Sequence, residues 1–190
     1  MPRFAEFSVN LDRISTPVRQ SIQRQIAAKH GKSRRFKPMI KVMFVCHGNI
    51  CRSPMGEFIL KDLLRKEHLN GHTVASSAVS REEIGNPVYP PARRELAKHG
   101  ISCDGHHARQ LTRAEYDQYD LFLVMDSSNL HLLKRIFPDD PEDKVHRLLE
   151  FAGRPNEDVD DPWYSGDFST AYADILAGCE GLLEYIRNAE

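Results

Sequence analysis

Short apolar runs alternate with segments of helical periodicity along this chain, and this alternation constrains its fold more than any other feature. Strands that are buried on both faces of a parallel sheet form near-continuous apolar runs, and parallel neighbours are joined by long crossovers that are usually helices. The runs that predict strands are residues 41–45, 73–79, 120–125 and, more weakly, 145–149. We therefore expect an α/β fold with a four-stranded parallel sheet and helices on both faces.

Capping residues indicate where the helices should begin and end. Ser53 is expected to cap a helix that has Pro54 at its first position and runs to about Leu69. Further helices are expected over residues 91–99, from Asp126 or Ser127 to 137, and over 167–186, with a short one at the capping box of Thr112 and Glu115. Gly100 suits the left-handed geometry that ends a helix, and residues 150–166, rich in Gly, Pro and Asp, are expected to form a loop.

The size and cysteine content of the chain limit its class. With 190 residues, of which 41% are hydrophobic, it can bury the core of one ordinary domain without disulfides or metals. Its four cysteines are too few and too irregularly spaced for a disulfide framework or a zinc site. No apolar run approaches the roughly 18 residues of a membrane span, and the start lacks a signal peptide. We expect a soluble, cytoplasmic protein with reduced thiols.

The first 38 residues differ in charge from the rest of the chain. They hold nine Lys or Arg against Glu6 and Asp12, a balance of +7, whereas the remainder carries −8. Apolar residues recur in this segment at helical spacing, at Leu11, Ile14, Val18, Ile22 and Ile26. A basic extension of this kind is usually solvated, so no nucleic acid partner is expected. We expect residues 1–38 to be a dispensable extension, helical or disordered, of a domain over residues 39–190.

The residues with the clearest chemistry follow the first predicted strand, where five positions separate Cys46 from Arg52. Ligands of parallel sheets bind outside the carboxyl ends of strands, which is where Cys46 falls. A loop that curls from there toward a helix N-terminus can direct backbone N–H groups, the helix dipole and a guanidinium at a phosphate ester. The same field favours a thiolate at neutral pH. Without this context, a small buried cysteine and an unrelated surface arginine would be the ordinary interpretation.

The run from Val45 to Glu57, VCHGNICRSPMGE, closely resembles the active-site signature of the low-molecular-weight protein tyrosine phosphatases. The resemblance continues, in the family's order, through residues 106–112 (HHARQLT), 120–130 (DLFLVMDSSNL) and 161–164 (DPWY). It covers nearly all of residues 39–190. It implies a flavodoxin-like four-stranded parallel sheet, an enzyme that hydrolyses phosphotyrosine on proteins, and neither metal nor cofactor.

The resemblance also implies roles for individual residues. Cys46 would be the nucleophile that forms a phosphocysteine, Arg52 would hold the equatorial phosphate oxygens, and Asp161 would be the general acid and then the general base. Sequence alone would make Asp161 a turn residue before Pro162. The expected substrate-binding residues are His47, Gly48, Asn49, Ile50, Cys51, Ser53, Trp163 and Tyr164. The two aromatic residues could admit a phosphotyrosine ring and exclude phosphoserine, or could instead pack onto the domain.

The family has a cysteine at the position of Cys51 that can form a disulfide with the nucleophile. We therefore predict a reversible redox switch, in which Cys51 traps the oxidised Cys46 before irreversible damage occurs. Cys103 and Cys179 are expected to be structural or incidental.

The loop after the second strand departs from the family, which often has a glycine and a large aromatic there. This chain has Val79 and no aromatic before Tyr89, so substrate preference is less constrained than reaction type. Glu82 and Glu83 in this loop would disfavour acidic substrates, although a solvated charge pair is the simpler interpretation.

Other activities on the same fold remain alternatives. A thioredoxin-coupled arsenate reductase would need two further cysteines about six residues apart, which Cys103 and Cys179 do not provide. Protein-arginine phosphatases tend to have Thr at the position of Ile50, so Ile50 favours tyrosine. A phosphate-binding module without catalysis would not require Cys46, Arg52 and Asp161 together. The expected partners are a phosphotyrosine protein and the tyrosine kinase that phosphorylates it.

Overall fold

The computed structural model describes residues 39–189, and the helical spacing between Leu11 and Ile26 lies outside them. Four parallel strands form one sheet in the order β2-β1-β3-β4. Their bounds are β1 (Lys41–Cys46), β2 (Thr73–Ala78), β3 (Leu121–Val124) and β4 (Val145–Arg147). The expected four-stranded parallel sheet is therefore confirmed. The fourth strand is shorter than predicted because the chain turns at once into the 3-10 helix η3 (Leu148–Glu150), where the Glu150 carboxylate accepts from Arg147 N at 3.0 Å.

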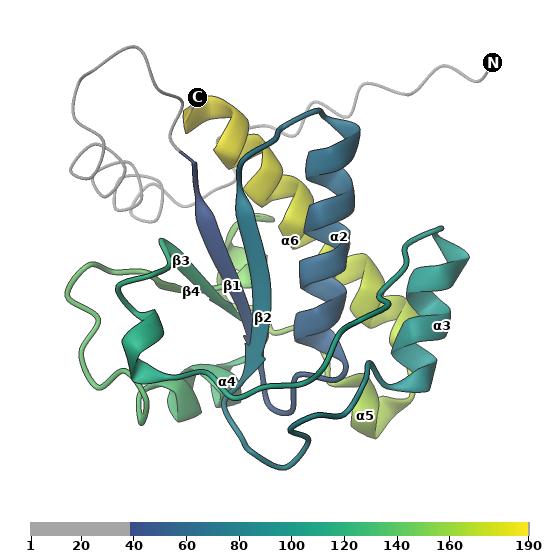
Figure 1. The fold of residues 1–190 in the computed structure, drawn as a ribbon, viewed down its shortest axis with the longest axis horizontal. Helices are drawn as coiled ribbons and strands as arrows, with labels where there is room; N and C mark the ends of the chain where they lie inside the picture. The colour runs from purple at the N-terminus through teal and green to yellow at the C-terminus, as the bar shows by residue number, and fades with distance from the viewer. Residues whose placement is uncertain (1–38, 190) are drawn as a thin grey trace.

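Five α-helices accompany the sheet in the described part of the chain (Figure 1). They are α2 (Arg52–Lys66), α3 (Pro90–Lys98), α4 (Ser127–Leu133), α5 (Pro162–Ser165) and α6 (Phe168–Ala189), and a second 3-10 turn is η2 (Arg113–Glu115). The capping box of Thr112 and Glu115 is present at η2, as expected. Within residues 39–189, no helix combines the length and apolarity that crossing a bilayer would require.

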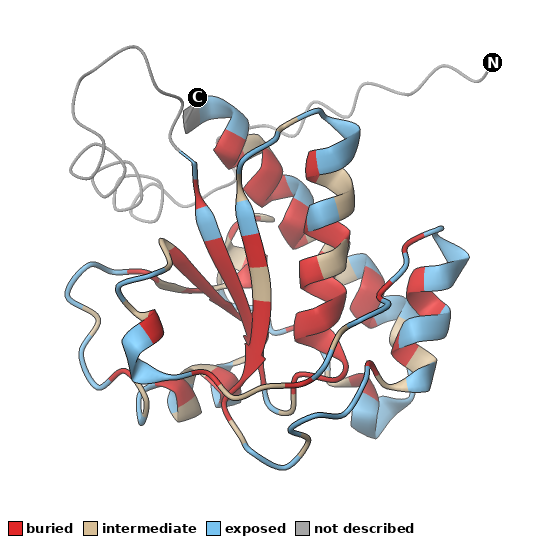
Figure 2. Ribbon diagram, in the orientation of Figure 1, coloured by how far each residue is buried: buried red, intermediate tan, exposed pale blue. Residues whose placement is uncertain are grey.

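The residues of β1 alternate between two apolar clusters, which shows that both faces of the sheet are covered. Val42 and Phe44 belong to the larger cluster, which includes the apolar residues of α2 and α6. Met43 and Val45 belong to the second cluster, on the face covered by α4. β1 and β3 are accordingly buried almost throughout, while α3 and α6 alternate between buried and exposed positions along their length (Figure 2). This two-sided burial explains why β1 and β3 are nearly continuous apolar runs in the sequence.

The start of α2 differs from the prediction. Its N-cap is Cys51, which makes no side-chain capping bond, and Ser53 is the second residue of the helix. Ser53 does not cap the helix because its hydroxyl is used elsewhere, 3.0 Å from the sulfur of Cys46. Pro54 is tolerated at the third position because the first four N–H groups of a helix have no partner within the helix.

Two further segments differ from the predicted structure, and each contains a helix that an aspartate caps. Asp126, one of the two residues expected to cap α4, does so: its Oδ1 accepts from Asn129 N at 2.5 Å. The helix ends at Leu133, earlier than the predicted end at 137. The segment 150–166 was expected to be a loop throughout. It contains α5, which Asp161 caps by accepting from Trp163 N.

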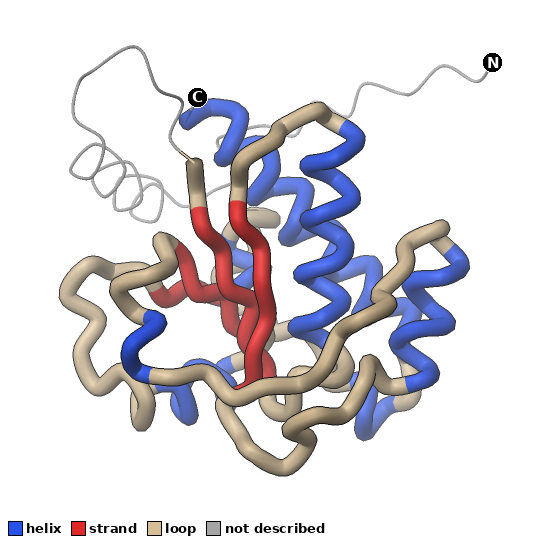
Figure 3. Tube along the Cα trace, in the orientation of Figure 1, coloured by secondary structure: helices blue, strands red, loops and turns tan. Residues whose placement is uncertain are grey.

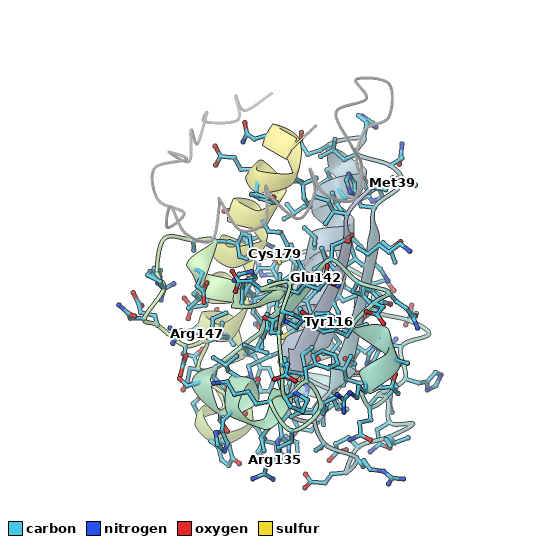
Figure 4. The ribbon with its side chains drawn as sticks, turned by 90° about the vertical axis from the view of Figure 1, so that its left-hand side faces the viewer. Met39, Tyr116, Arg135, Glu142, Arg147 and Cys179 are labelled. Carbon is cyan, nitrogen blue, oxygen red and sulfur yellow. The ribbon has the colours of Figure 1, made fainter. Side chains whose placement is uncertain are left out.

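The strand order determines where a ligand can approach. The connection from β1 leads through α2 to β2 on one side, and β3 lies on the other side of β1, so the chain diverges at the carboxyl end of β1. Such a divergence leaves a crevice at the edge of a parallel sheet. The connections that gather at this edge lie at the bottom of Figure 3, where α2 and α5 also begin. Met39 and Arg135 mark opposite ends of the molecule in Figure 4.

Cys179 lies in the interior, where α6 packs against α2 (Figure 4). Its thiol donates to the carbonyl of Gly56 at 3.7 Å, and burial raises the pKa of the thiol well above its usual range. The position agrees with the structural role expected for this cysteine.

Gly181 of α6 provides a test of the close packing between α6 and η3. A Cβ at this position would lie 2.0 Å from the carbonyl oxygen of Phe151. A Gly to Ala change in a helix ordinarily stabilises the helix by about 1 kcal/mol. Here we expect the opposite: Gly181→Ala should lower the free energy of unfolding by about 1–3 kcal/mol, because α6 must move to make room for the new methyl group. Urea unfolding measures the change. Ala173→Gly on the exposed side of α6 should cost about 1 kcal/mol, and a gain in stability for Gly181→Ala would contradict the packing described.

Candidate active site

The loop between β1 and α2 turns its carbonyl groups outward. Four of these oxygens accept hydrogen bonds from surrounding segments, at 2.8–3.0 Å. The pairs are Val79 N to Cys46 O, Ser80 N to His47 O, the His106 ring to Asn49 O, and Tyr89 N to Ile50 O. In a trans peptide the C=O and the following N–H point in opposite directions. The amides of the loop therefore face its interior, where they can donate to an anion.

Cys46, the last residue of β1, lies at the start of this loop and is almost fully buried. Asn49 N donates to its sulfur at 3.3 Å, and the Ser53 hydroxyl lies 3.0 Å from it. The N-terminus of α2 begins directly after the loop, so the positive end of the helix dipole lies at the same place. These groups all stabilise negative charge on the sulfur.

Asn49 braces the loop from behind. Its backbone has a φ of 60°, a left-handed conformation that asparagine tolerates better than most residues. Its side-chain amide donates to Ser53 Oγ at 2.9 Å and to Ser76 Oγ at 2.8 Å, while its Oδ1 accepts from Arg109 N at 3.1 Å. Because every polar atom of this buried side chain has a partner, the loop conformation is closely specified.

Arg52 connects the loop to two other segments. Its NH1 group donates to Asp126 Oδ2 at 2.5 Å and to the carbonyl of Val159 at 3.1 Å, and its NH2 group donates to Asp161 Oδ2 at 2.5 Å. Burial disfavours the charged guanidinium, but the negative charges of Cys46, Asp126 and Asp161 outweigh this effect and raise the pKa of Arg52 above its usual value. The guanidinium is thus permanently charged and fixed in direction.

Asp161 has two structural functions in the same carboxylate. Its Oδ1 caps α5 by accepting from Trp163 N at 3.1 Å, and its Oδ2 holds Arg52. Asp161 is therefore both the turn residue that its position before Pro162 indicates and a neighbour of Arg52, as the resemblance implies. The Asp161 side chain is about one quarter exposed, which leaves it accessible from the pocket.

A pocket of about 170 Å³ opens over Cys46 and Arg52. Of the expected site residues, it is lined by Cys46, His47, Gly48, Ile50, Cys51, Arg52, Asp161, Trp163 and Tyr164. The side chains of Asn49 and Ser53 do not line the pocket; they are buried and bonded to each other, and would support the phosphate site from behind the loop. Glu82 and Glu83 line the pocket as well. Trp163 is 52% exposed and packs against the ring of Tyr89, 5.0 Å between centroids.

Cys51 lines the pocket but differs from Cys46 in its environment. Burial, together with the negative charges of Cys46 and Asp161, raises the pKa of the Cys51 thiol far above its usual range. Cys51 therefore remains a thiol at neutral pH. Cys46, rather than Cys51, is therefore the candidate for the thiolate that attacks phosphorus.

The sequence interpretation did not assign three residues that shape this site. Asp126 holds Arg52, Ser76 anchors Asn49, and Tyr89 supports Trp163. Asp126 could have been found, because it follows the strand next to β1 and so lies at the same edge of the sheet as Cys46. Ser76 and Tyr89 gave no comparable signal. Among the described residues, no group of three or more His, Cys, Asp or Glu side chains is arranged to hold a metal ion.

Comparison with known proteins identifies relatives of this chain. Residues 41–190 match the model of the family "Low molecular weight phosphotyrosine protein phosphatase". The low molecular weight protein-tyrosine-phosphatase YfkJ of Bacillus subtilis is 40% identical over 151 residues, which are 78% of this chain and 97% of that protein. The corresponding enzyme PtpA of Staphylococcus aureus is 36% identical over 148 residues, with coverage of 78% and 94%.

Two solved structures extend the comparison to the fold. The crystal structure of YfkJ superposes with a TM-score of 0.76 at 38% identity and covers 82% of this chain and 98% of its own. The structure of the drosophila arginine phosphatase DARP gives a TM-score of 0.70 at 33% identity, with coverage of 76% and 96%. The fold expected from the resemblance is confirmed by these neighbours.

The left-handed backbone of Asn49 can be tested separately from its hydrogen bonds. Asn49→Gly removes the side-chain bonds but keeps the backbone accessible, whereas Asn49→Ala also adds a strain of about 1–2 kcal/mol. We expect the alanine variant to bind inorganic phosphate about 5- to 30-fold more weakly than the glycine variant, as measured by titration calorimetry. Equal affinities of the two variants would show that this backbone conformation carries no energetic weight.

Proposed function

We propose that this chain, which belongs to the low molecular weight phosphotyrosine protein phosphatase family, hydrolyses phosphotyrosine on proteins through a phosphocysteine at Cys46. Its named relatives are protein-tyrosine-phosphatases, so the chain is a phosphoric monoester hydrolase that acts on phosphoproteins. The observation that carries the mechanism is the pocket in which Cys46, Arg52 and Asp161 meet beneath inward-facing amides.

In the first step the thiolate of Cys46 attacks phosphorus. A phosphorus–sulfur bond forms as the bond from phosphorus to the tyrosine oxygen breaks, and protonated Asp161 gives its proton to the departing phenolate. The loop amides and the guanidinium of Arg52 hold the equatorial oxygens, on which negative charge is concentrated. The hydroxyl of Ser53, 3.0 Å from the sulfur, can donate a hydrogen bond to the thiolate.

In the second step water attacks the phosphocysteine. The Asp161 carboxylate takes a proton from the water, the phosphorus–sulfur bond breaks, and inorganic phosphate leaves with the Cys46 thiolate restored. One carboxyl group can serve both steps because it is deprotonated by the first and reprotonated by the second.

The contact between Arg52 and Asp161 is consistent with this sequence of events. Arg52 NH2 donates to the carboxylate of Asp161 at 2.5 Å. A phosphate dianion offers Arg52 better-matched oxygens for a bidentate contact. Its arrival would release Asp161 toward the leaving group, while Asp126 keeps holding the guanidinium on its other side.

Preference for tyrosine is supported by the walls of the pocket. Ile50 contributes an apolar side chain to the pocket lining, and Trp163 and Tyr164 contribute aromatic ones. A solved relative at 33% identity is titled an arginine phosphatase, so phosphoarginine is the substrate to compare directly.

The proposal extends to the cellular setting. A tyrosine kinase must supply the phosphoprotein, and that kinase is the expected functional partner. We also propose that the enzyme works in the cytoplasm, on the support that its four cysteines are free thiols, as is usual in a reducing compartment.

The activity is tested with peptides that carry phosphotyrosine, phosphoserine or phosphoarginine. We expect the native enzyme to prefer phosphotyrosine and Cys46→Ser to be inactive while still binding phosphate. Asp161→Asn should lower kcat on phosphotyrosine by about 10²–10⁴. It should affect p-nitrophenyl phosphate less, because that leaving group needs less protonation. Faster turnover of phosphoarginine would reassign the substrate, and no phosphatase activity of the native enzyme would refute the proposal.

Reversible oxidation is tested at Cys51. Peroxide would convert the Cys46 thiolate to a sulfenic acid, and the Cys51 thiol, which lines the same pocket, would displace hydroxide from it to form a disulfide and water. We expect the native enzyme to regain activity with dithiothreitol, and Cys51→Ser to lose activity irreversibly. If the two proteins recover to the same extent, Cys51 has no protective role.

A further inference from the structure

We infer that Glu82 and Glu83 make this phosphatase selective for phosphotyrosines with basic neighbours in the substrate. The inference rests on the proposed function and concerns the same pocket. It depends on where the loop after β2 places these two carboxylates, on what holds them there, and on the other charges at the pocket mouth.

The loop that carries both residues is fixed to the phosphate loop and to its surroundings. Ser80 N donates to His47 O at 3.0 Å, and Gly85 N donates to Ala108 O at 2.8 Å. The segment between these anchors forms one wall of the pocket, since both Glu82 and Glu83 line it together with Cys46. Their position in the pocket is thus set by backbone bonds on either side.

Glu83 packs directly on the phosphate loop. A Cβ at Gly48 would lie 3.0 Å from Glu83 Cγ, so the aliphatic part of Glu83 covers that glycine. Its carboxylate accepts from Asn86 Nδ2 at 2.7 Å, which keeps the charge on the rim. Together with burial and the charges of Cys46 and Asp161, this charge raises the pKa of the Cys51 thiol in the same pocket.

Glu82 lies farther out and faces His47 across the mouth of the pocket. Its Oε2 is 3.0 Å from His47 Nε2, and 71% of its side chain is exposed. Glu83 lines the same pocket, and the hydrogen-bond partner of its carboxylate is the uncharged amide of Asn86. The rim on this side is therefore negative at neutral pH.

Positive charge in the pocket is confined to its base. Arg52 is the one Lys or Arg among the lining residues in the described chain, and it is already held by Asp126 and Asp161. The lining also includes the aromatic residues Trp163 and Tyr164. A phosphate dianion thus meets Arg52 in the pocket, whereas the residues that flank it in a peptide pass the carboxylates of Glu82 and Glu83.

This separation predicts a preference in the flanking sequence. A Lys or Arg beside the phosphotyrosine gains an exposed ion pair with the rim, and an acidic residue meets like charge instead. Exposed pairs of this kind change affinity about two- to fivefold each. Over two flanking positions we expect a ratio of about ten between a basic and an acidic peptide at low ionic strength.

The experiment compares two phosphotyrosine peptides that are identical except for the residues on either side of the phosphotyrosine, which are Lys in one and Glu in the other. The quantity measured is the ratio of their kcat/KM values at low salt. We expect a ratio of about ten for the native enzyme and a ratio near one for the double variant Glu82→Gln and Glu83→Gln. The matched control is Glu67→Gln, because Glu67 follows the far end of α2 and pairs with Arg187. It should keep the native ratio.

A second measurement keeps the inference testable if the double variant does not fold. For the native enzyme, the ratio should fall toward one as salt is raised from about 10 mM to 500 mM, because the exposed charges are then screened. A native ratio near one at low salt, or a ratio unchanged in a folded double variant, would overturn the inference. If the native enzyme hydrolyses neither peptide, the proposed function itself fails.

Discussion

The hydrogen bonds of Asn49 fix the loop conformation on which the candidate active site depends. The side chain joins the loop to Ser53 of α2, to Ser76 of β2 and to the backbone of Arg109. With the left-handed backbone held in this way, the neighbouring carbonyl groups can bond outward and the amides inward. Ser76 in turn donates to the buried carboxylate of Glu57 at 2.5 Å, so the arrangement is supported by a satisfied polar network under the loop.

Arg52 has the second organising role, because it brings together segments that are remote in the chain. It connects α2 with Asp126 after β3 and with the segment of Val159 and Asp161 before α5. A guanidinium offers several donors in a fixed plane, so one side chain can set the positions of both carboxylates and still face a phosphate. The acid, the anion site and the nucleophile are therefore positioned by one connected set of bonds.

The strands, most of the helices and the Cys46 loop could be predicted from sequence because each depends on local pattern. Errors arose where a side chain had a distant partner. Ser53 has the residue type of a helix cap, but its hydroxyl is next to Cys46. The fourth strand was expected to continue to 149, but Glu150 turns the backbone into η3. Asp161 was identified only by resemblance, since 109 positions separate it from Arg52 and its own sequence context indicated a turn.

The sequence by itself determined the α/β class, the parallel sheet and the presence of a cysteine and an arginine at the end of its first strand, since buried strands and helix starts have periodic and local signatures. Only the tertiary structure decided which carboxylates hold Arg52, which residues stand behind the loop rather than in the pocket, and that Glu82 and Glu83 form its rim. The physical reason is that hydrogen bonds and charges act over a few ångströms in space. Which groups come that close depends on how the whole chain folds around the sheet.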